Sequence, residues 1–453
     1  MNILLYTPPV PSQSIRMDYL ISCEPLELEY LYTVLKEKHA IYFLEKGRKA
    51  KLFKMIAENN IHLLCISCYI THIPFVLKVA KKLKRTFPKL YITVGGVHAE
   101  VVPEHFFSPD IDAVVFGNQL EVIRKIADSL SCSKIPEKTK GAAFRKDDFA
   151  MQPPASDAMV YPIPERIIFK RKPHKYYYLY FESCVSLKTA QGCPGNCSFC
   201  FCCKMNAGIY KMRPIDEVVD EIEGISAGNI FILDDNFLTV PTRIESFCDA
   251  LEKRDIKKKF IAYGTADFIA QHPRLMDRLK KNGLSALIVG LEYISSTDLQ
   301  AVHKKATPAD NDLTISICHD LDIELFALFI CDPGWHHRDF FRLASYIWHK
   351  KIRFATFSTP TVFPKTEEAI RQHATFQVEK LWRYDLLRLH GKPANITAFS
   401  YYIWLYLLYL LPAMRFSNLR HILKRYGWRK GMGAVLKSSL SGAEYFLKLL
   451  IWK

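Results

Sequence analysis

The chain has 453 residues, 49% of them hydrophobic and 24% charged; this is too long for one compact core, so we expect two or three domains. Its thirteen cysteines, in a sequence without a secretory signal, argue against a disulfide framework and for a reducing compartment, so we expect a cytoplasmic protein. The formal net charge of +16 would suit nucleic acid or an anionic membrane, but no nucleic-acid-reading motif accompanies it, and we expect no nucleic-acid partner.

Residues 1–135 have the pattern of a doubly wound α/β domain of the flavodoxin-like kind. Apolar runs at 2–6 and 61–68 are typical of parallel strands buried on both faces, and 73–87 has the apolar spacing of a helix. Strands are also predicted within 90–98 and 110–117, and such a sheet binds ligands beyond the carboxyl ends of its strands. Glycines there let a backbone approach a large ligand, although turn glycines without a ligand are the alternative. The predicted ends carry Ser67, Thr71, Gly95, Gly96, His98 and Gly117.

A linker is predicted at 136–178, where the sequence is polar, rich in proline and includes a basic cluster at 166–175. A second β/α alternation follows at 179–370. Strands are predicted within 185–192, 229–237, 258–268, 284–293 and 323–334, with helices such as 272–283 between them. The repetition predicts a complete or partial β/α barrel, and we expect a partial TIM barrel of the (β/α)6 type. The chemistry of such barrels lies at the carboxyl ends of the strands.

Five cysteines fall within residues 191–204, and three of them, Cys193, Cys197 and Cys200, have the spacing C-x3-C-x2-C. Thiolates hold iron–sulfur clusters, usually four for a four-iron cluster, so three ligands would leave one iron open to a substrate or cofactor. A closed zinc site is the alternative, but the usual zinc pattern has a second cysteine pair, and no suitable pair is present. Cys202 and Cys203 are either additional ligands or small packed residues.

The C-terminal region, 371–453, is predicted to be helical and basic, with nine Lys or Arg and one acid from Arg415 onward. The run 398–414 is apolar, rich in Tyr and Trp and interrupted by Pro412, and it is marginally short for a spanning helix of about 20 residues. The closing residues 443–453 alternate apolar and basic positions at helical spacing. Two interpretations remain open: a membrane-surface segment, or an ordinary helix that covers the barrel.

The cysteine loop is similar to that of the radical S-adenosylmethionine (SAM) enzymes, in which C-x3-C-x2-C follows the first barrel strand. The segment FILDDNF at 231–237 resembles the second-strand segment whose acids meet the amino group of the cofactor, which makes Asp234 and Asp235 candidates. A solvated turn or a helix cap is the alternative for this pair. The segment VGLEY at 289–293 resembles the fourth-strand segment, in which Glu292 would contact the nucleoside.

The first domain, through residues 93–122, resembles the cobalamin-binding domain that precedes the barrel in one radical SAM subfamily, which includes methylases and the anaerobic cyclase of chlorophyll synthesis. The resemblance covers residues 1 to about 390 and implies three cofactors: a [4Fe-4S] cluster, SAM and cobalamin. Two departures bear on cobalamin affinity and substrate shape rather than on the cluster loop: Asn118 replaces the first acid of the usual G-E-x-E, and CDPG at 331–334 replaces Gly-x-Asp. The absence of D-x-H-x-x-G predicts no histidine ligand to cobalt, as is common in this subfamily.

The resemblance implies a methyltransferase that acts on an unactivated carbon. Two alternatives stay open: a cyclisation or oxidative rearrangement with the same cofactors, and a non-catalytic metal-binding protein associated with a membrane. No catalytic residue is assigned. His336 and His337 are either substrate-facing or loop residues, and Lys304 and Lys305 either neutralise the cofactor carboxylate or lie solvated on a helix.

The aromatic content of 13% and the apolar run at 398–414 suit an apolar substrate, such as a lipid, and peripheral contact with a membrane. A soluble intermediate of an antibiotic pathway would fit a barrel equally well. The family resemblance also implies a low-potential electron donor, such as a ferredoxin or a flavodoxin, as a partner.

Overall fold

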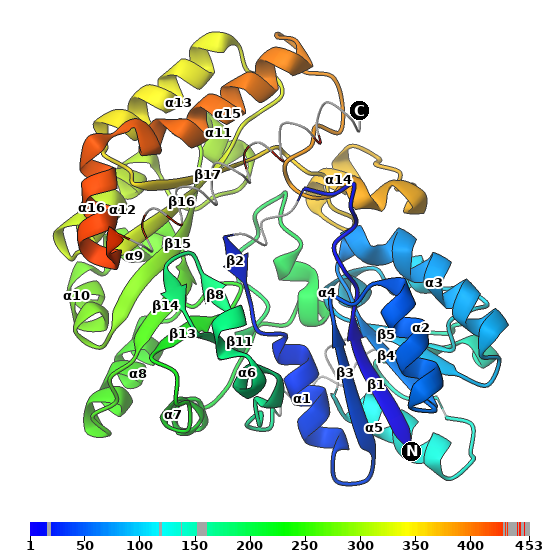
Figure 1. Cartoon of the computed structure of the whole chain (residues 1–453). Helices are drawn as coiled ribbons and strands as arrows, with labels where there is room; N and C mark the ends of the chain where they lie inside the picture. The colour runs from blue at the N-terminus through cyan, green and yellow to red at the C-terminus, as the bar shows by residue number, and fades with distance from the viewer. Residues whose placement is uncertain are drawn as a thin grey trace.

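The computed structural model describes residues 1–15, 20–116, 120–136, 138–151 and 161–428, together with residues 431, 433, 442, 444 and 448. Two sheets of six strands each organise these residues, one in the first part of the chain and one in the second (Figure 1). The predicted α/β class, with a doubly wound domain followed by a partial barrel and a helical C-terminal end, is confirmed.

The first sheet has the order β3-β1-β4-β5-β6-β7 and is parallel except for β7, which runs antiparallel to β6. Successive residues of β1 are fully buried because they point to opposite sides: Leu4 and Tyr6 join the core on one face of the sheet, and Ile3 and Leu5 the core on the other. The strands are β1 (Asn2–Thr7), β3 (Ala40–Glu45), β4 (Leu63–Ser67), β5 (Tyr91–Gly95), β6 (Ala113–Val115) and β7 (Ala142–Phe144).

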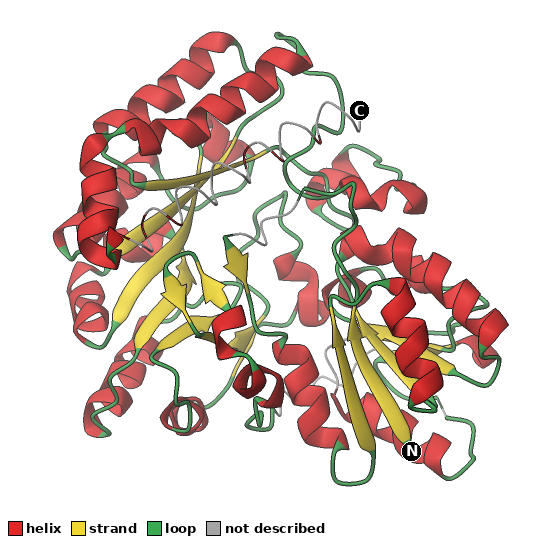
Figure 2. Ribbon diagram, in the orientation of Figure 1, coloured by secondary structure: helices red, strands yellow, loops and turns green. Residues whose placement is uncertain are grey.

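Helices cover both faces of this first sheet, as the continuous apolar strands require (Figure 2). One face packs against α2 and α3, and the other against α1 and α5. The helices are α1 (Leu26–Leu35), α2 (Lys49–Glu58), α3 (Ile73–Thr86), α4 (Val97–Val101) and α5 (Leu120–Ser131), with short turns η1 (Ile70–His72), η2 (Pro103–Phe106) and η3 (Arg145–Asp147).

The second sheet is wholly parallel and its strands follow chain order, β10-β13-β14-β15-β16-β17, which is the topology of an open (β/α)6 barrel. Its strands are β10 (Cys184–Leu187), β13 (Asn229–Ile232), β14 (Lys259–Gly264), β15 (Leu284–Glu292), β16 (Glu324–Ile330) and β17 (Phe354–Ser358). Its helices are α7 (Ile215–Glu223), α8 (Pro241–Lys253), α9 (Ala266–Gln271), α10 (Pro273–Lys281), α11 (Ser296–Ala301), α12 (Pro308–Asp320), α13 (His337–His349) and α15 (Ala398–Met414).

Aromatic side chains fill the inside of the partial barrel. Phe231 and Phe326 point inward and pack against Tyr178 and Phe181, which belong to a small antiparallel sheet of β2 (Ile21–Ser22), β8 (Tyr177–Tyr178) and β9 (Phe181–Glu182). Because β2 precedes the first domain's α1, this small sheet ties the beginning of the chain to the barrel. The interior is therefore a packed core, and ligands bind at its carboxyl edge.

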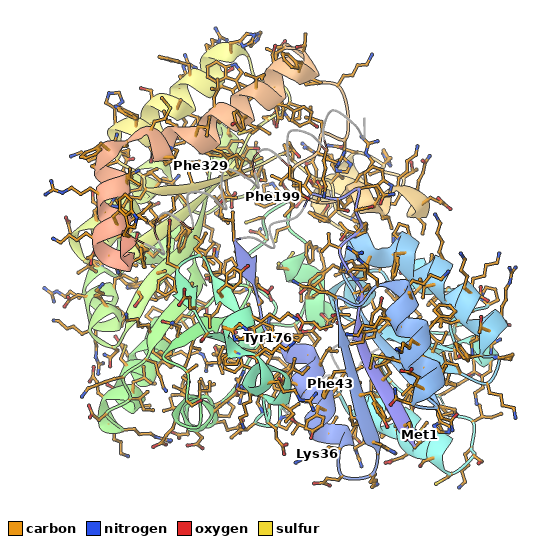
Figure 3. The ribbon with its side chains drawn as sticks, in the orientation of Figure 1. Met1, Lys36, Phe43, Tyr176, Phe199 and Phe329 are labelled. Carbon is orange, nitrogen blue, oxygen red and sulfur yellow. The ribbon has the colours of Figure 1, made fainter. Side chains whose placement is uncertain are left out.

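The segment 136–178, predicted as a linker, is built into both domains where the structure describes it. It supplies β7 to the first sheet, the short helix α6 (Ile167–Arg171) and the turn η4 (Pro173–Lys175). Tyr176, labelled in Figure 3, is buried and donates from its hydroxyl to Glu45 Oε2 over 2.8 Å. Residues 152–160 lie outside the described residues.

The run 398–414 forms α15 over its whole length and packs on β17 and α13, with Tyr401, Leu405 and Leu408 buried in the barrel core. The interpretation as a barrel-covering helix is therefore correct for one of its faces. Helix α16 (Phe416–Tyr426) continues from it. Among the helices that the structure describes, none combines the length and the apolar character needed to cross a bilayer.

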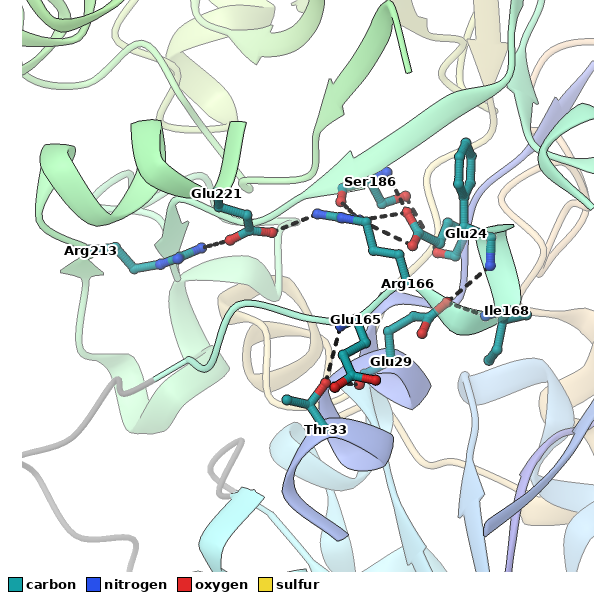
Figure 4. A network of polar contacts seen from close by, with 10 residues as sticks. Glu24, Glu29, Thr33, Glu165, Arg166, Ile168, Ser186, Arg213 and Glu221 are labelled. Atoms are coloured by element: carbon teal, nitrogen blue, oxygen red, sulfur yellow. Dashed lines mark hydrogen bonds and ion pairs between the residues drawn. The ribbon is translucent and has the colours of Figure 1, made fainter. Parts of the chain in front are cut away.

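A buried network of charges joins the two domains through the segment that precedes the barrel (Figure 4). Arg166 donates to Glu24 at 2.8 and 3.0 Å, to Glu221 at 2.6 Å and to the Ser186 carbonyl at 2.9 Å. Glu221 also accepts from Arg213 at 2.6 Å, and every one of these side chains is at most 6% exposed. Burial raises the pKa of Glu24 to about 7, against the opposing charge of Arg166.

Replacing Arg166 with Met is expected to lower the free energy of unfolding by about 3–5 kcal/mol, because Glu24 and Glu221 would stay buried without their shared cation. Urea unfolding monitored by tryptophan fluorescence would measure the loss. Arg254→Met is the matched control: Arg254 pairs with Asp220 and Glu223 near the surface, and its loss should change the free energy of unfolding far less than the loss of Arg166. Equal effects of the two substitutions would contradict the role given to the network.

Candidate functional site

The cysteine loop leaves the barrel after β10 and is anchored at its base. The antiparallel pair β11 (Ala190–Gln191) and β12 (Lys211–Met212) brackets it, and the turn η5 (Cys202–Gly208) lies within it. Inside the loop, Ser198 N donates to the Val302 carbonyl over 3.1 Å, and the Ser198 carbonyl accepts from Glu368 N over 3.0 Å. Phe199, labelled in Figure 3, packs against Tyr293, Leu299 and Ile330. The loop is therefore held between α11 and α14 (Glu367–Arg371).

Cys193, Cys197 and Cys200 are half-buried, unpaired in disulfides and close enough to influence one another. Burial raises the pKa of Cys197 to about 11; Lys304 opposes this shift, whereas a charge on Cys200 adds to it. Burial also raises the pKa of Cys193, and a charge on Cys200 adds to this shift. The Cys193 Sγ accepts a hydrogen bond from Gly195 N at 3.4 Å. Within the described ranges, no three His, Cys, Asp or Glu side chains are gathered as ligands of a single metal ion.

The two adjacent acids after β13 have different environments. Asp234 is buried, and its carboxylate accepts from Thr189 N at 2.7 Å, from Ala190 N at 2.9 Å and from the Thr189 hydroxyl. Burial raises its pKa, and Lys188 and these hydrogen bonds oppose the shift. Because its oxygens are already engaged, Asp234 fastens the segment that leads into the cysteine loop.

Asp235 faces the cysteines. Its Oδ2 atom is buried and, among the described residues, accepts no hydrogen bond; the nearest cation, Lys188 Nζ, is 3.6 Å away. Burial raises the pKa of Cys193, and a charge on Asp235 adds to that shift; the neighbouring Cys202 lowers the pKa of Cys200, and Asp235 opposes it, so the carboxylate lies beside the loop. A buried carboxylate oxygen without a donor is costly, so this atom is suited to a cationic ligand group such as the ammonium of SAM.

Glu292 ends β15 in a left-handed conformation, with φ of 59°, which is uncommon for a residue other than glycine. Its carboxylate folds back over Gly290 and accepts from Lys304 Nζ at 3.0 Å. A Cβ on Gly290 would lie 2.0 Å from Glu292 Oε1 and 3.0 Å from Lys304 Nζ, so only glycine leaves room for this ion pair. Sequence reasoning did not choose between Lys304 and Lys305; the structure buries Lys304 beside the loop and exposes Lys305.

The candidates of the first domain gather at the carboxyl edge of its sheet. Ser67 ends β4 and donates from its hydroxyl to Glu27 Oε1 at 3.3 Å, and Gly95 ends β5. Gly96 has φ of 99°, and a Cβ there would lie 2.9 Å from Cys68 N. Thr71 lies in η1 at the same edge. Gly117 and Asn118 lie outside the described residues.

This edge faces the cysteine loop across a cavity of about 50 Å³. α4 contacts η5, so the strand ends of the first sheet and the loop of the barrel meet. His98 belongs to the wall; its Nε2 lies 3.0 Å from His105 Nδ1, and burial lowers its pKa to about 3, which keeps the ring neutral. The cavity is lined by Tyr69, Ile70, Val97, His98, Val101, Phe201, Phe363 and Pro364, nearly all of them apolar.

The other predicted residues contribute less to this site. His336 precedes α13 as its N-cap and is exposed, and His337 Nδ1 accepts from Trp404 Nε1 at 2.7 Å, so His337 serves the contact between α13 and α15. Cys202 lies close to Cys200 and Asp235, and Cys203 Sγ donates to the Cys200 carbonyl at 3.5 Å.

Two protein-family models match the chain: a B12 binding domain at residues 19–127 and the Radical SAM superfamily at residues 187–347. These matches confirm the resemblance to radical SAM enzymes with a cobalamin-binding domain, and with it the three expected cofactors. The hopanoid C-3 methylase of Methylococcus capsulatus is 23% identical over 365 residues, which cover 79% of this chain and 70% of the relative. The anaerobic magnesium-protoporphyrin IX monomethyl ester cyclase of a Synechocystis strain is 23% identical over 276 residues, 57% of this chain and 53% of the relative.

Two solved structures share the fold. The methyltransferase TsrM from Kitasatospora setae, solved with cobalamin and a [4Fe-4S] cluster bound, superposes with a TM-score of 0.63 at 16% identity, covering 82% of this chain and 77% of that one. The cobalamin-dependent enzyme OxsB, solved with aqua-cobalamin, gives a TM-score of 0.62 at 15% identity, covering 89% and 60%. Both therefore share the fold of this chain over most of its length.

Gly290→Ala is expected to weaken SAM binding roughly five- to hundred-fold, because a methyl group at this position must displace Glu292 or Lys304 at an overpacking cost of about 1–3 kcal/mol. Calorimetric titration of the reconstituted protein with SAM would measure the change. Gly228→Ala is the control, since a Cβ at Gly228 meets no atom within 4 Å. Unchanged SAM affinity in Gly290→Ala would show that Glu292 and Lys304 do not contribute to the SAM site.

Proposed function

Because this chain is a radical SAM enzyme with a B12-binding domain, we propose that it methylates an unactivated carbon of an apolar small molecule. The observation that carries the proposal is the meeting of two carboxyl edges: Val97 and His98, which follow Gly95 and Gly96, and Phe201, which follows Cys200, line one apolar cavity. Ligands of both fold types bind at these edges, so a group held by the first domain and one held by the barrel would face the same space.

The residues fit the three cofactors. Cys193, Cys197 and Cys200 would hold the [4Fe-4S] cluster, and Asp235 and Glu292 would contact SAM. Ser67, Thr71, Gly95 and Gly96 would line the cobalamin site, and Gly117, outside the described residues, stays a prediction there. When bound, these groups supply radical hydrogen abstraction and a transferable methyl group.

The chain's own residues orient the ligands and keep water away. Asp235 Oδ2 is placed to accept from the ammonium of SAM, and Asp234 holds the loop segment at Thr189 and Ala190 in register. Lys304 donates one of its three N–H groups to Glu292, so the other two can bind the carboxylate of SAM. The apolar wall formed by Phe201 and Phe363 would exclude water from the reacting carbon.

An apolar substrate, such as a lipid, is favoured by the cavity wall and by the similarity to a hopanoid C-3 methylase. We also propose peripheral contact with a membrane, where such a substrate resides. A low-potential donor, such as a ferredoxin or a flavodoxin, would supply the electrons, and we propose it as a partner.

A second candidate is a cyclisation or oxidation without methyl transfer, because a magnesium-protoporphyrin cyclase is among the relatives. The non-catalytic alternative raised from the sequence is set aside, since the chain carries a radical SAM domain.

After anaerobic reconstitution with iron, sulfide and hydroxocobalamin, the protein is expected to hold about four irons per chain and one cobalamin. With SAM, reductant and substrate it should form 5′-deoxyadenosine and S-adenosylhomocysteine, detected by mass spectrometry. Replacing Cys193, Cys197 and Cys200 with Ala should remove the iron, whereas Cys132→Ala, at an exposed cysteine of the first domain, should not.

The products separate the candidates. 5′-Deoxyadenosine without S-adenosylhomocysteine would favour the cyclase-like reaction over methylation. Bound zinc with no iron would refute both. A cluster without cobalamin would refute a cobalamin site at the first domain.

A further inference from the structure

Helices α13 and α15 run side by side (Figures 1 and 2). Both present exposed apolar side chains to solvent. Near their beginnings His337 accepts a hydrogen bond from Trp404, and near their ends the Arg415 guanidinium stacks on the Trp348 ring at 4.5 Å. We call this surface the outer face. It consists of Phe341 and Trp348 of α13, Phe399, Leu407 and Met414 of α15, and Phe416 of α16, all of which are exposed.

Helix α15 is apolar on every side, although the barrel covers only one of them. Its buried face is formed by Tyr401, Leu405 and Leu408. On the opposite side the helical spacing brings together Phe399, Ile403, Leu407, Leu410 and Met414, of which Phe399 is 63% and Met414 74% exposed. A helix on the surface of a globular domain normally turns polar residues to water, so a contiguous apolar side indicates another contact.

The surroundings of the outer face are strongly basic. Residues 398–428 contain no Asp or Glu, and Asp339 is the single acid between 337 and 353. Arg420 and Lys424 on α16 are exposed, and among the described residues neither has an acidic partner. Large apolar side chains beside cations are the combination that binds an anionic membrane surface, where the cations meet headgroups and the apolar groups enter the acyl boundary.

The outer face begins at the barrel edge that carries the cysteine loop. Tyr401, near the start of α15, donates from its hydroxyl to the Cys331 carbonyl just beyond β16. Phe199 of the cysteine loop packs with Ile330, the last residue of β16, and with Trp335 before α13. A membrane on the outer face would therefore lie next to the rim of the candidate site.

We propose that the outer face is a peripheral binding surface for an anionic lipid bilayer. This proposal extends the proposed function and rests on it, because the bilayer would supply the apolar substrate. A second copy of this chain is the competing occupant. Charge favours the bilayer, since a symmetric dimer would bring two basic surfaces together.

Co-sedimentation of the full chain with vesicles tests the proposal. Vesicles of equal parts phosphatidylglycerol and phosphatidylcholine should bind the protein, and vesicles of phosphatidylcholine alone should bind it at least about ten-fold more weakly. Phe399→Ser, Met414→Ser and Phe416→Ser together should lower binding about ten-fold or more. Arg420→Gln with Lys424→Gln should lower binding to the anionic vesicles about twenty-five-fold, at about five-fold for each cation lost.

Matched variants control for general effects of composition. Ile135→Ser, Met151→Ser and Ile163→Ser replace exposed apolar residues elsewhere, and Lys81→Gln with Lys89→Gln replaces exposed cations of the first domain; neither set should change binding. Equal binding of the outer-face variants and their controls would overturn the proposal. So would a dimer in analytical ultracentrifugation that only the outer-face Ser variant dissociates. The assay needs neither SAM nor reductant, so it fails or succeeds independently of the methylation assay.

Discussion

The buried guanidinium of Arg166 is the constraint on which the arrangement of the two domains depends. It joins Glu24, which precedes α1 of the first domain, to Glu221 on the first barrel helix and to the carbonyl of Ser186 in the first barrel strand. Moving either domain would leave a charge buried without its partner, which is far more costly than losing a surface ion pair. The network therefore fixes the angle at which the carboxyl edges of the two sheets meet, and with it the cavity between α4 and η5.

Most strands could be predicted because they are buried on both faces, which leaves continuous apolar runs such as Ile3–Tyr6 in the sequence. In the two six-stranded sheets, the strands that sequence reasoning missed, β3, β7 and β17, are at edges. β3 borders the first sheet and is largely half-buried, and β7 has only three residues in a segment whose prolines and polar residues predict a linker. Edge strands are decided by the partner that pairs with them, and that partner is far away in the chain.

In the candidate site, sequence spacing identified the groups but could not choose between neighbours. Asp234 and Asp235 are adjacent, and only the contact of Asp234 with Thr189, 45 residues earlier, shows which carboxylate is already engaged. Lys304 and Lys305 differ in the same way, because the ion pair with Glu292 depends on the space above Gly290. The role of Arg166 could not be predicted, because the composition of the basic cluster 166–175 indicates a solvated surface. In the structure the side chain of Arg166, the first residue of this cluster, is buried.

The apolar run at 398–414 left two interpretations open for a physical reason: a helix that is apolar all round has no polar side to show where water lies. The barrel accounts for the side with Tyr401, Leu405 and Leu408, and it leaves the side with Phe399 and Met414 in solvent. One helix can thus cover the last barrel strand and still offer a second apolar surface. Because α15 starts beside Cys331 at the carboxyl edge of the barrel, this second surface begins next to the edge that carries the cysteine loop.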